Sequence, residues 1–217
     1  MLTEKKYGQP PVDLGMIDLS VDEMMFWMYC PVKLKHQDRW KLPDNLQKYE
    51  CLLEEVYLDI YERLKDEERW YNSYIYMTAK TLWVTADNPG NRPGWHSDGF
   101  LTNDLNYLWY DDTPTVFWEP KELVAFEKDH QKSLLQMEAV TGYGPYKTYP
   151  CKHLLRLDET VIHRVANVTK PGMRTFIKVS VSSEKYDLKG NSINHKLNTG
   201  WQLRDRQQER NPPSKET

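Results

Sequence analysis

The sequence predicts an α+β fold in which helical segments come first and strands follow. Residues 44–70 place apolar side chains at the three- and four-residue spacing of one helical face. Residues 74–182 divide into short runs of β-branched and aromatic residues, separated by turns of Gly, Pro, Asn and Asp. A chain of 217 residues can bury a sizeable core. We therefore expect one domain over residues 1–217.

The first 70 residues are predicted to form a lead-in and two helices. Residues 1–19 contain Pro10, Pro11 and Gly15 and are expected to be irregular. Ser20 and Glu23 have the spacing of a capping box, which would open a helix that stops before Pro31. Asp44 would cap a longer helix to about residue 70. Residues 20–70 are thus expected to be a helical support, and the expected buried stripe of the longer helix is Leu46, Tyr49, Leu53, Val56, Tyr57, Ile60 and Leu64.

The middle of the chain is predicted to be mostly strands. Residues 120–140 are the exception, because their composition indicates an inserted helix that Gly142 and Gly144 end. From residue 184 the sequence turns polar, and residues 203–217 carry too little apolar surface to fold alone, so a flexible tail is expected. The expected strands cover 74–85, 105–110, 115–118, 146–149, 153–157, 160–168 and 173–182.

Four residues in the strand region are the candidates for metal and anion binding. His96 and Asp98 are two apart, so an extended backbone directs both side chains to one face. His163 shares a face with Val161 and Val165, which suits an interior position. Alternation along 173–182 places Arg174 on the mixed face, pointing inward. Taken alone, His96 and Asp98 would be an ordinary loop pair, and His163 a core histidine.

Two histidines and one carboxylate are the ligand set of a facial triad, which leaves metal positions open for co-substrate and O2. Four protein ligands would close the site, as in structural zinc. No cysteine joins His96, Asp98 and His163 in this pattern, so iron is favoured over zinc. An arginine in a barrel interior needs an anion. Arg174 is therefore expected to clamp a bound carboxylate through its planar fork, or to pair internally with an Asp or Glu.

The order His96-x-Asp98, His163 and then Arg174 resembles the Fe(II)/2-oxoglutarate-dependent dioxygenase superfamily over about residues 72–183. The resemblance implies a double-stranded β-helix (a jelly-roll or cupin-like barrel) over those residues, with N-terminal helices packed on the larger sheet. It implies that Arg174 holds the distal carboxylate of 2-oxoglutarate. Many relatives have Arg-x-Ser, whereas this chain has Phe176 at the Ser position. Another hydroxyl would then take the role, with Tyr76, Thr78 and Tyr110 as candidates.

The implied activity is hydroxylation or oxidative demethylation of a substrate with O2 and 2-oxoglutarate, which yields succinate and CO2. The alternative is a catalytically inactive cupin-like barrel that binds a small anionic ligand or nucleotide. An amino acid, a nucleobase or another small molecule would fit as substrate. The candidate pocket walls flank the first ligands, and core packing is an equal explanation for each of them: Trp95, Phe100, Tyr107 and Trp109.

Composition limits the remaining properties. The chain has 29 basic and 32 acidic residues, a net charge of −3, which argues against strong duplex-DNA binding. Its 3 cysteines are far apart, so reduced, buried thiols in a cytoplasmic protein are expected. No apolar leader or 18-residue apolar run occurs, and no membrane span is expected. Among the other histidines, His153 is expected near the site, and the solvent is expected to reach His36, His130 and His195.

Overall fold

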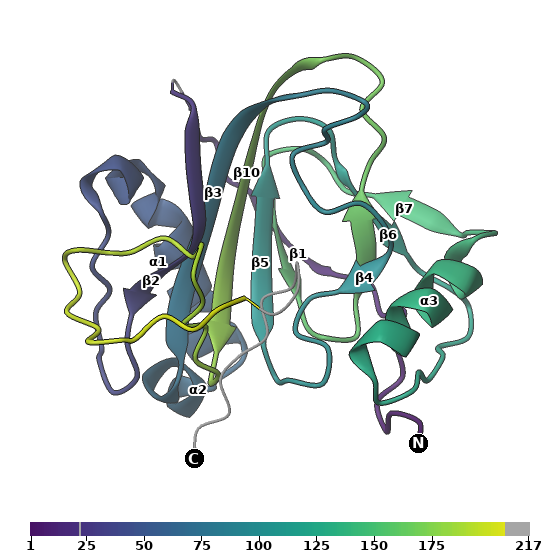
Figure 1. Cartoon of the computed structure of the whole chain (residues 1–217), viewed down its shortest axis with the longest axis horizontal. Coiled ribbons are helices and arrows are strands. Elements are labelled where there is room, and N and C mark those ends of the chain that lie inside the picture. Colours follow the sequence, from purple (N-terminus) through teal and green to yellow (C-terminus); the bar gives the residue numbers. More distant parts are fainter. Residues whose placement is uncertain (22, 207–217) are drawn as a thin grey trace. The chain divides into compact units, whose positions relative to one another are not determined.

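Antiparallel sheets dominate the computed structural model, which describes residues 1–21 and 23–206 and contains few helices (Figure 1). The chain divides into two units. The first comprises Met1–Glu23 and Thr81–Phe176, and the second comprises Met24–Lys80 and Ile177–Thr217. No helix in the described part of the chain is long and apolar enough to cross a membrane.

The smaller sheet belongs wholly to the first unit. Its strand order is β4-β9-β6-β7. β9 pairs in antiparallel fashion with both β4 and β6, and β6 pairs likewise with β7. The predicted strand at 115–118 is confirmed, while the one expected at 160–168 is shorter. The bounds are His96–Ser97 for β4, Thr115–Trp118 for β6, Tyr146–Thr148 for β7 and Ile162–Val165 for β9.

The larger sheet of the first unit has the order β1-β8-β5, followed by the first residues of β10 and the last residues of β3. The predicted strands at 74–85, 105–110, 153–157 and 173–182 are present here, with small differences at their ends. The bounds are Val12–Met16 for β1, Tyr74–Val84 for β3, Leu105–Tyr110 for β5, His153–Leu157 for β8 and Gly172–Ser182 for β10.

Strand β1 corrects the prediction of an irregular lead-in over 1–19. It pairs antiparallel with β8, and the register shifts between Asp13 and Met16. Gly15 has φ +99°, and its N–H donates to Asp13 Oδ1 at 2.9 Å. Pro10, Pro11 and Gly15 indicated an irregular segment in the sequence. The strand forms because it pairs with β8, and such long-range pairing cannot be predicted from the local sequence.

Helix α3 (His130–Thr141) is shorter than the helix predicted over 120–140. Asp129 caps it by accepting hydrogen bonds from the N–H groups of Gln131 and Lys132. Residues 120–129 are not helical. Val124 instead exchanges two backbone hydrogen bonds with Tyr7, at 2.7 and 3.1 Å. Long-range pairing therefore overrides the local helical composition.

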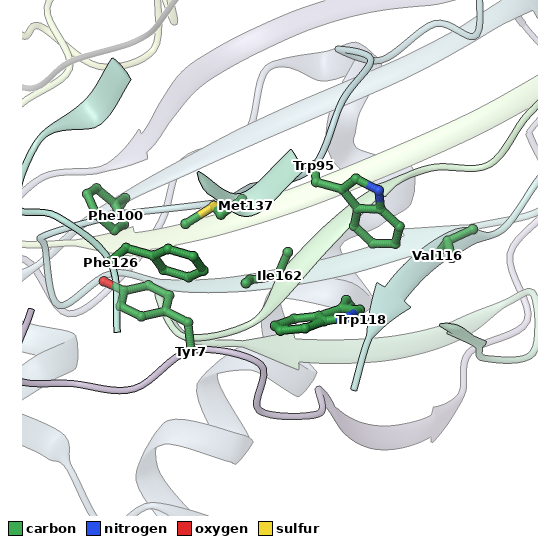
Figure 2. Close-up of a cluster of buried hydrophobic side chains, with 8 residues drawn as sticks. All are labelled: Tyr7, Trp95, Phe100, Val116, Trp118, Phe126, Met137 and Ile162. Carbon is green, nitrogen blue, oxygen red and sulfur yellow. The ribbon is translucent and has the colours of Figure 1, made fainter. Parts of the chain in front are cut away.

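Two hydrophobic clusters among the described residues of the first unit lie on opposite faces of the smaller sheet. The inner cluster joins both sheets, which suits a β-sandwich; it contains Leu108, Tyr110, Phe117, Leu155, Leu157, Val161 and Phe176. In the outer cluster, Ile162 lies between the Tyr7–Phe126 pair and Trp118 (Figure 2). The outer cluster contains Tyr7, Trp95, Phe100, Val116, Trp118, Phe126, Met137 and Ile162.

Strand β2 (Met25–Lys33) in the second unit replaces the helix predicted to end before Pro31, so that prediction is wrong. A run of Met, Phe, Trp and Tyr packs equally well in a buried helix or a strand, so its pattern is ambiguous. β2 is the last strand in the sheet order, where a proline costs no ladder bond. Tyr29 has φ +44°, and its N–H donates to Thr78 Oγ1 at 3.0 Å. Asp22 of the expected capping box lies outside the described residues.

The long helix predicted over 44–70 is divided into four pieces in the second unit. They are a 3-10 turn η1 (Asp44–Tyr49), α1 (Glu50–Leu58), a π-turn η2 (Asp59–Arg63) and α2 (Glu67–Asn72). Five predicted stripe residues are fully buried, whereas Tyr57 and Leu64 are half-buried. Asp44 begins η1 without a side-chain cap bond.

The helices pack on β2 within this unit. The Tyr49 hydroxyl donates to Met25 Sδ at 3.3 Å, and Lys33 Nζ lies 5.5 Å from the centre of the Trp70 ring. After β10, Leu188 and Arg204 form a parallel bridge within the second unit. The flexible tail predicted over 203–217 stays a prediction, and residues 207–217 lie outside the described part.

Candidate metal centre

The strand register places two histidines side by side. His96 of β4 is opposite His163 of β9, and His163 is in turn opposite Phe117 of β6. Residues aligned across neighbouring strands share one face of a sheet. The ring centres are accordingly 4.6 Å apart for His96–His163 and 6.0 Å apart for Phe117–His163. The extended backbone predicted at His96 is present, and His163 is interior as its alternation indicated.

Both imidazoles turn the same nitrogen toward the backbone. His96 Nδ1 lies 2.9 Å from the Gly94 carbonyl, and His163 Nδ1 lies 3.4 Å from the Val161 carbonyl. A carbonyl can only accept, so these contacts favour a proton on Nδ1 and a lone pair on Nε2. Backbone carbonyls commonly orient metal-binding histidines in this way. Each ring therefore presents Nε2 as a ligand atom.

Asp98 completes a cluster with the two histidines. His163 Nε2 is 3.6 Å from Asp98 Oδ2, and one ligand atom from each of the three residues lies within 4.8 Å of the others. The His163 side chain is 5% exposed and that of Asp98 is 20% exposed. The carboxylate therefore meets solvent at the edge of a site whose other side is buried.

The loop after Asp98 is held by a tight turn. Gly99 has φ +74°, and an added Cβ would lie 2.8 Å from Asp104 Cβ and 2.9 Å from Thr102 Oγ1. Thr102 donates to the Gly99 carbonyl through both its N–H and its hydroxyl, each at 2.8 Å. Only glycine fits this conformation and this space without strain. The turn thus fixes the direction in which Asp98 leaves β4.

Two polar contacts attach β4 to its surroundings. The Ser97 hydroxyl, between the two ligands, donates to the backbone carbonyl of Glu159 in the turn that precedes β9. The Trp95 N–H donates to Glu138 Oε2 of α3 at 3.0 Å. Sequence reasoning missed Glu138, Glu159 and Phe117, since none of them stands near His96 or Asp98 in the chain. The alternation of β6 and its pairing with β9 would be needed to find Phe117.

Arg174 is the third residue of β10, and it is only 2% exposed. Its Nε donates to the carbonyls of Asp112 and Thr113 at 3.1 and 3.0 Å. Arg174 Nη1 donates to the side-chain amide oxygen of Asn91 at 3.1 Å when that amide is oriented with its oxygen toward the arginine. Burial lowers the pKa of Arg174 from 12.5 to about 10, although the charges of Asp111 and Asp112 oppose this.

The second terminal nitrogen of Arg174 is buried without a hydrogen-bond partner in the described part of the chain. The expected alternative was an internal pair with Asp or Glu. No carboxylate among the described residues forms an ion pair with Arg174 within 4.0 Å; its partners are backbone carbonyls and an amide. A buried, unpaired cation with one free donor group is what an anion-binding arginine requires.

Phe176 lies against Arg174, whose Cζ is 5.2 Å from the ring centre. None of the three candidate hydroxyls is shown to contact Arg174. Tyr110 donates to the Tyr149 carbonyl at 3.2 Å, and burial, the main cause, holds its pKa well above the usual 10. In the second unit, Tyr76 donates to the Glu184 carbonyl and accepts from the Tyr186 N–H, while Thr78 accepts from Tyr29.

The four candidate pocket residues are all buried. Trp95 and Phe100 belong to the outer cluster of Figure 2, on the face of the smaller sheet opposite His163. Leu108 and Tyr110 of β5 belong to the inner cluster. Tyr107 and Trp109 alternate with them, so their side chains lie on the opposite face of β5. Trp109 donates to the Ile17 carbonyl at 2.9 Å. These positions favour the core-packing explanation.

The remaining histidines are not part of this cluster. His153 was expected near the site, but its Nδ1 lies 2.9 Å from Asp13 Oδ1 in a β1–β8 contact. His36, His130 and His195 are exposed, as predicted. The three cysteines are free; Cys30 is buried, whereas Cys51 and Cys151 are half-buried rather than buried.

No protein-family model matches the chain, and no curated protein matches it either.

Proposed function

We propose that this protein is an Fe(II)- and 2-oxoglutarate-dependent dioxygenase that hydroxylates or oxidatively demethylates a small substrate. The observation that carries the proposal is the convergence of His96, Asp98 and His163, two on adjacent strands and one just beyond. Their donor atoms are two imidazole nitrogens and one carboxylate oxygen. That set suits a divalent metal with open positions, and its lack of thiolate favours iron over structural zinc.

The chain's own residues prepare this centre in three ways. The Gly94 and Val161 carbonyls keep Nδ1 occupied, so that Nε2 of each histidine faces the metal position. Asp98 adds a negative charge, which offsets part of the charge of a divalent ion. Phe117 packs against His163 and, with the rest of the inner cluster, excludes water from that side. When bound, Fe(II) with 2-oxoglutarate and O2 supplies oxidation of a C–H bond, with succinate and CO2 as co-products.

Arg174 is the proposed holder of the distal carboxylate of 2-oxoglutarate. Its Nη2 is buried and has donors to spare, while Nε and Nη1 are fixed by backbone and amide oxygens. This fixation orders the guanidinium before any anion arrives, which reduces the entropy lost on binding. Phe176 supplies an apolar surface in place of the usual serine hydroxyl. The hydroxyl that many relatives use is therefore left unreplaced in this proposal.

The same proposal includes the double-stranded β-helix fold. Its support is the pairing order β4-β9-β6-β7 and the inner cluster shared between the two sheets of the first unit. An amino-acid, nucleobase or other small-molecule substrate fits a site with one edge open at Asp98. A cytoplasmic location agrees with three free thiols. A catalytically inactive barrel that binds a small anion is the alternative, because Arg174 would suit either.

The test needs no knowledge of the substrate. Under anaerobic conditions, Fe(II) and 2-oxoglutarate are added and the visible charge-transfer band of a chelated keto-acid is recorded. We expect a band in the wild type, none in His163→Ala, and a requirement for at least tenfold more 2-oxoglutarate in Arg174→Met. His195→Ala is the matched control, because His195 is exposed. It should leave the band unchanged.

Two outcomes would contradict the proposal in different ways. A wild type that retains no Fe(II) would remove the dioxygenase hypothesis. If it instead bound 2-oxoglutarate through Arg174 without metal, the anion-binding barrel would take its place. A band that survives in His163→Ala would show that the metal is held elsewhere.

A further inference from the structure

The first eight residues of the chain, which we call the N-terminal strap, contact the segment before α3, the loop after Asp98 and the turn before β9. The strap is attached at one side to the segment before α3. Thr3 donates its N–H to the Phe126 carbonyl at 2.7 Å, and Tyr7 exchanges two backbone hydrogen bonds with Val124. Gly8 is packed so closely that a Cβ there would lie 2.7 Å from the Pro120 ring. The strap is therefore a fixed part of the first unit.

One strap side chain touches both loops that position the ligands. Lys5 Nζ donates to Asn103 Oδ1 at 3.2 Å, and it also forms an ion pair with Glu159. Asn103 follows Asp98 by five residues, in the same loop. Glu159 precedes His163 by four residues, in the turn that leads into β9. Lys5 thus links the loop of one ligand to the turn of another.

Neighbouring strap residues reinforce both connections. The Tyr7 ring lies 5.4 Å from the ring of Phe100, two residues beyond Asp98 in the same loop. On the other side, the Gly8 N–H donates to the Thr160 carbonyl at 2.8 Å. The strap therefore holds the Asp98 loop and the His163 turn together through side chain and backbone alike.

Glu159 is the more consequential end of the Lys5 ion pair. Its side chain is 6% exposed, whereas that of Lys5 is 56% exposed. An exposed ion pair contributes little to global stability, but a buried carboxylate left without its partner is costly. The Glu159 backbone carbonyl also accepts from Ser97, which lies between His96 and Asp98. Movement of Glu159 toward water would consequently disturb its backbone contact with Ser97, which lies between two of the proposed ligands.

We propose that Lys5 is a positioning residue for the metal centre, which it stabilises by holding the Asp98 loop at a fixed separation from the His163 turn. The inference rests on the proposed metal site, although the contacts that carry it lie outside that site. Lys5 touches none of the three ligands; its effect passes through Asn103 and Glu159. Loss of Lys5 should therefore weaken metal binding far more than it weakens the fold.

The test compares Lys5→Met with Lys6→Met in the full chain. Lys6 is the adjacent, exposed lysine, so both variants lose the same charge from the same segment. Metal-free protein is titrated with Co(II), and binding is followed in the visible spectrum. We expect Lys5→Met to bind Co(II) about tenfold more weakly than the wild type, a difference of about 1.4 kcal/mol. Lys6→Met should match the wild type, and Lys5→Arg should restore most of the affinity.

A second measurement needs no metal. Amide hydrogen exchange of the metal-free proteins should be faster in Lys5→Met within residues 99–104 and 158–163, and unchanged elsewhere. The urea midpoint of Lys5→Met should be only slightly lower than that of Lys6→Met, because Glu159 loses its partner but can turn toward water. Should Lys5→Met fail to fold, Glu159→Gln provides the same test from the other end of the pair, with the shape of the side chain retained.

The two proposals fail separately. Equal Co(II) affinities for Lys5→Met and Lys6→Met, with normal binding by the wild type, would overturn the role of Lys5 and leave the metal centre intact. A wild type that binds no Co(II) would overturn the metal centre and, with it, the purpose assigned to Lys5. Unchanged exchange in both segments would also overturn the role of Lys5.

Discussion

Replacing Arg174 by Met should have a small effect on the stability of the ligand-free protein. Burial lowers the pKa of Arg174 from 12.5 to about 10. At about 1.4 kcal/mol per pKa unit, the buried charge costs roughly 3 kcal/mol. Methionine removes that cost. It also removes the donor to the Asp112 and Thr113 carbonyls, and each unsatisfied buried group costs about 1–3 kcal/mol, or about 2–6 kcal/mol for both. The opposing effects leave an expected net change within about 3 kcal/mol of zero.

The response to 2-oxoglutarate should differ far more. A ligand at one hundred times its dissociation constant stabilises the native state by about 2.7 kcal/mol. The wild type should gain this amount, and Arg174→Met should gain little because its site lacks the Nη2 donors. The assay is urea unfolding at pH 7 with Mn(II), with and without 2-oxoglutarate. Arg92→Met is the control, because Arg92 is an exposed arginine in the loop before His96.

Two results would refute this reasoning. Equal stabilisation of the wild type and Arg174→Met by 2-oxoglutarate would show that the guanidinium does not receive the anion. A loss of more than about 4 kcal/mol in ligand-free Arg174→Met would show that Arg174 is mainly structural, since lost hydrogen bonds would then exceed the relief of the buried charge.

Three further predictions concern other parts of the chain. Burial lowers the pKa of Lys33 from 10.5 to about 8. Between these pH values the unfolded state binds more protons than the folded state, so the free energy of unfolding should rise with pH by up to about 3 kcal/mol. Urea titrations should find this rise in the wild type and not in Lys33→Met. Gly99→Ala should lower the free energy of unfolding by more than the roughly 1–2 kcal/mol of left-handed backbone strain, because its Cβ would also clash, and it should weaken Co(II) binding. Gly15→Ala is the control, because a Cβ there meets nothing within 4 Å. In the same urea assay it should show the backbone strain alone. Burial raises the pKa of the Cys30 thiol to about 12. A thiol reagent at pH 8 should therefore modify the half-buried Cys51 and Cys151, but it should reach Cys30 only after the protein unfolds. Modification of Cys30 in the native protein would contradict the packing of β2.

The candidate ligands could be predicted because their signal is local. His96 and Asp98 are two residues apart, and alternation alone fixes their shared direction. His163 and Arg174 follow the same rule within their own strands. The strands at 105–110 and 115–118 were equally accessible, because turn residues bound each run. Local periodicity therefore pointed to residues that the structure brings together, along with the strands that hold two of them.

The errors arose where long-range pairing decides the structure. Residues 25–33 are apolar and aromatic on both faces, which does not distinguish a buried helix from a strand. β1 exists because β8 offers an edge, and no local pattern over Val12–Met16 announces this. The long helix breaks at Lys65, with φ +54°, and restarts where Asp66 accepts from the Arg69 N–H. A continuous helical stripe gives no warning of that break.

The pocket residues illustrate a different difficulty. Trp95 is adjacent to His96, and closeness in the chain suggested a shared pocket. In a strand, adjacent residues point in opposite directions. Trp95 accordingly packs with Ile162 and Trp118 in the outer cluster, while His96 faces His163. Substrate-facing side chains should therefore be sought among residues that share the alternation of His163 and reach the open edge at Asp98, rather than among the chain neighbours of His96.

Register is the property on which the proposed metal centre depends. Because side-chain direction has a period of two, a one-residue slip of β4 against β9 would place Ser97 opposite His163 and turn His96 away. A strand as short as His96–Ser97 has too few ladder bonds to fix its own register. The contacts around it supply what it lacks: Glu138 holds Trp95, Glu159 holds Ser97, and Gly99 turns the chain away beyond Asp98. The geometry of the proposed ligands is thus set partly by residues that would bind no metal, so removal of the Glu138 carboxylate should alter metal affinity while leaving every proposed ligand in place.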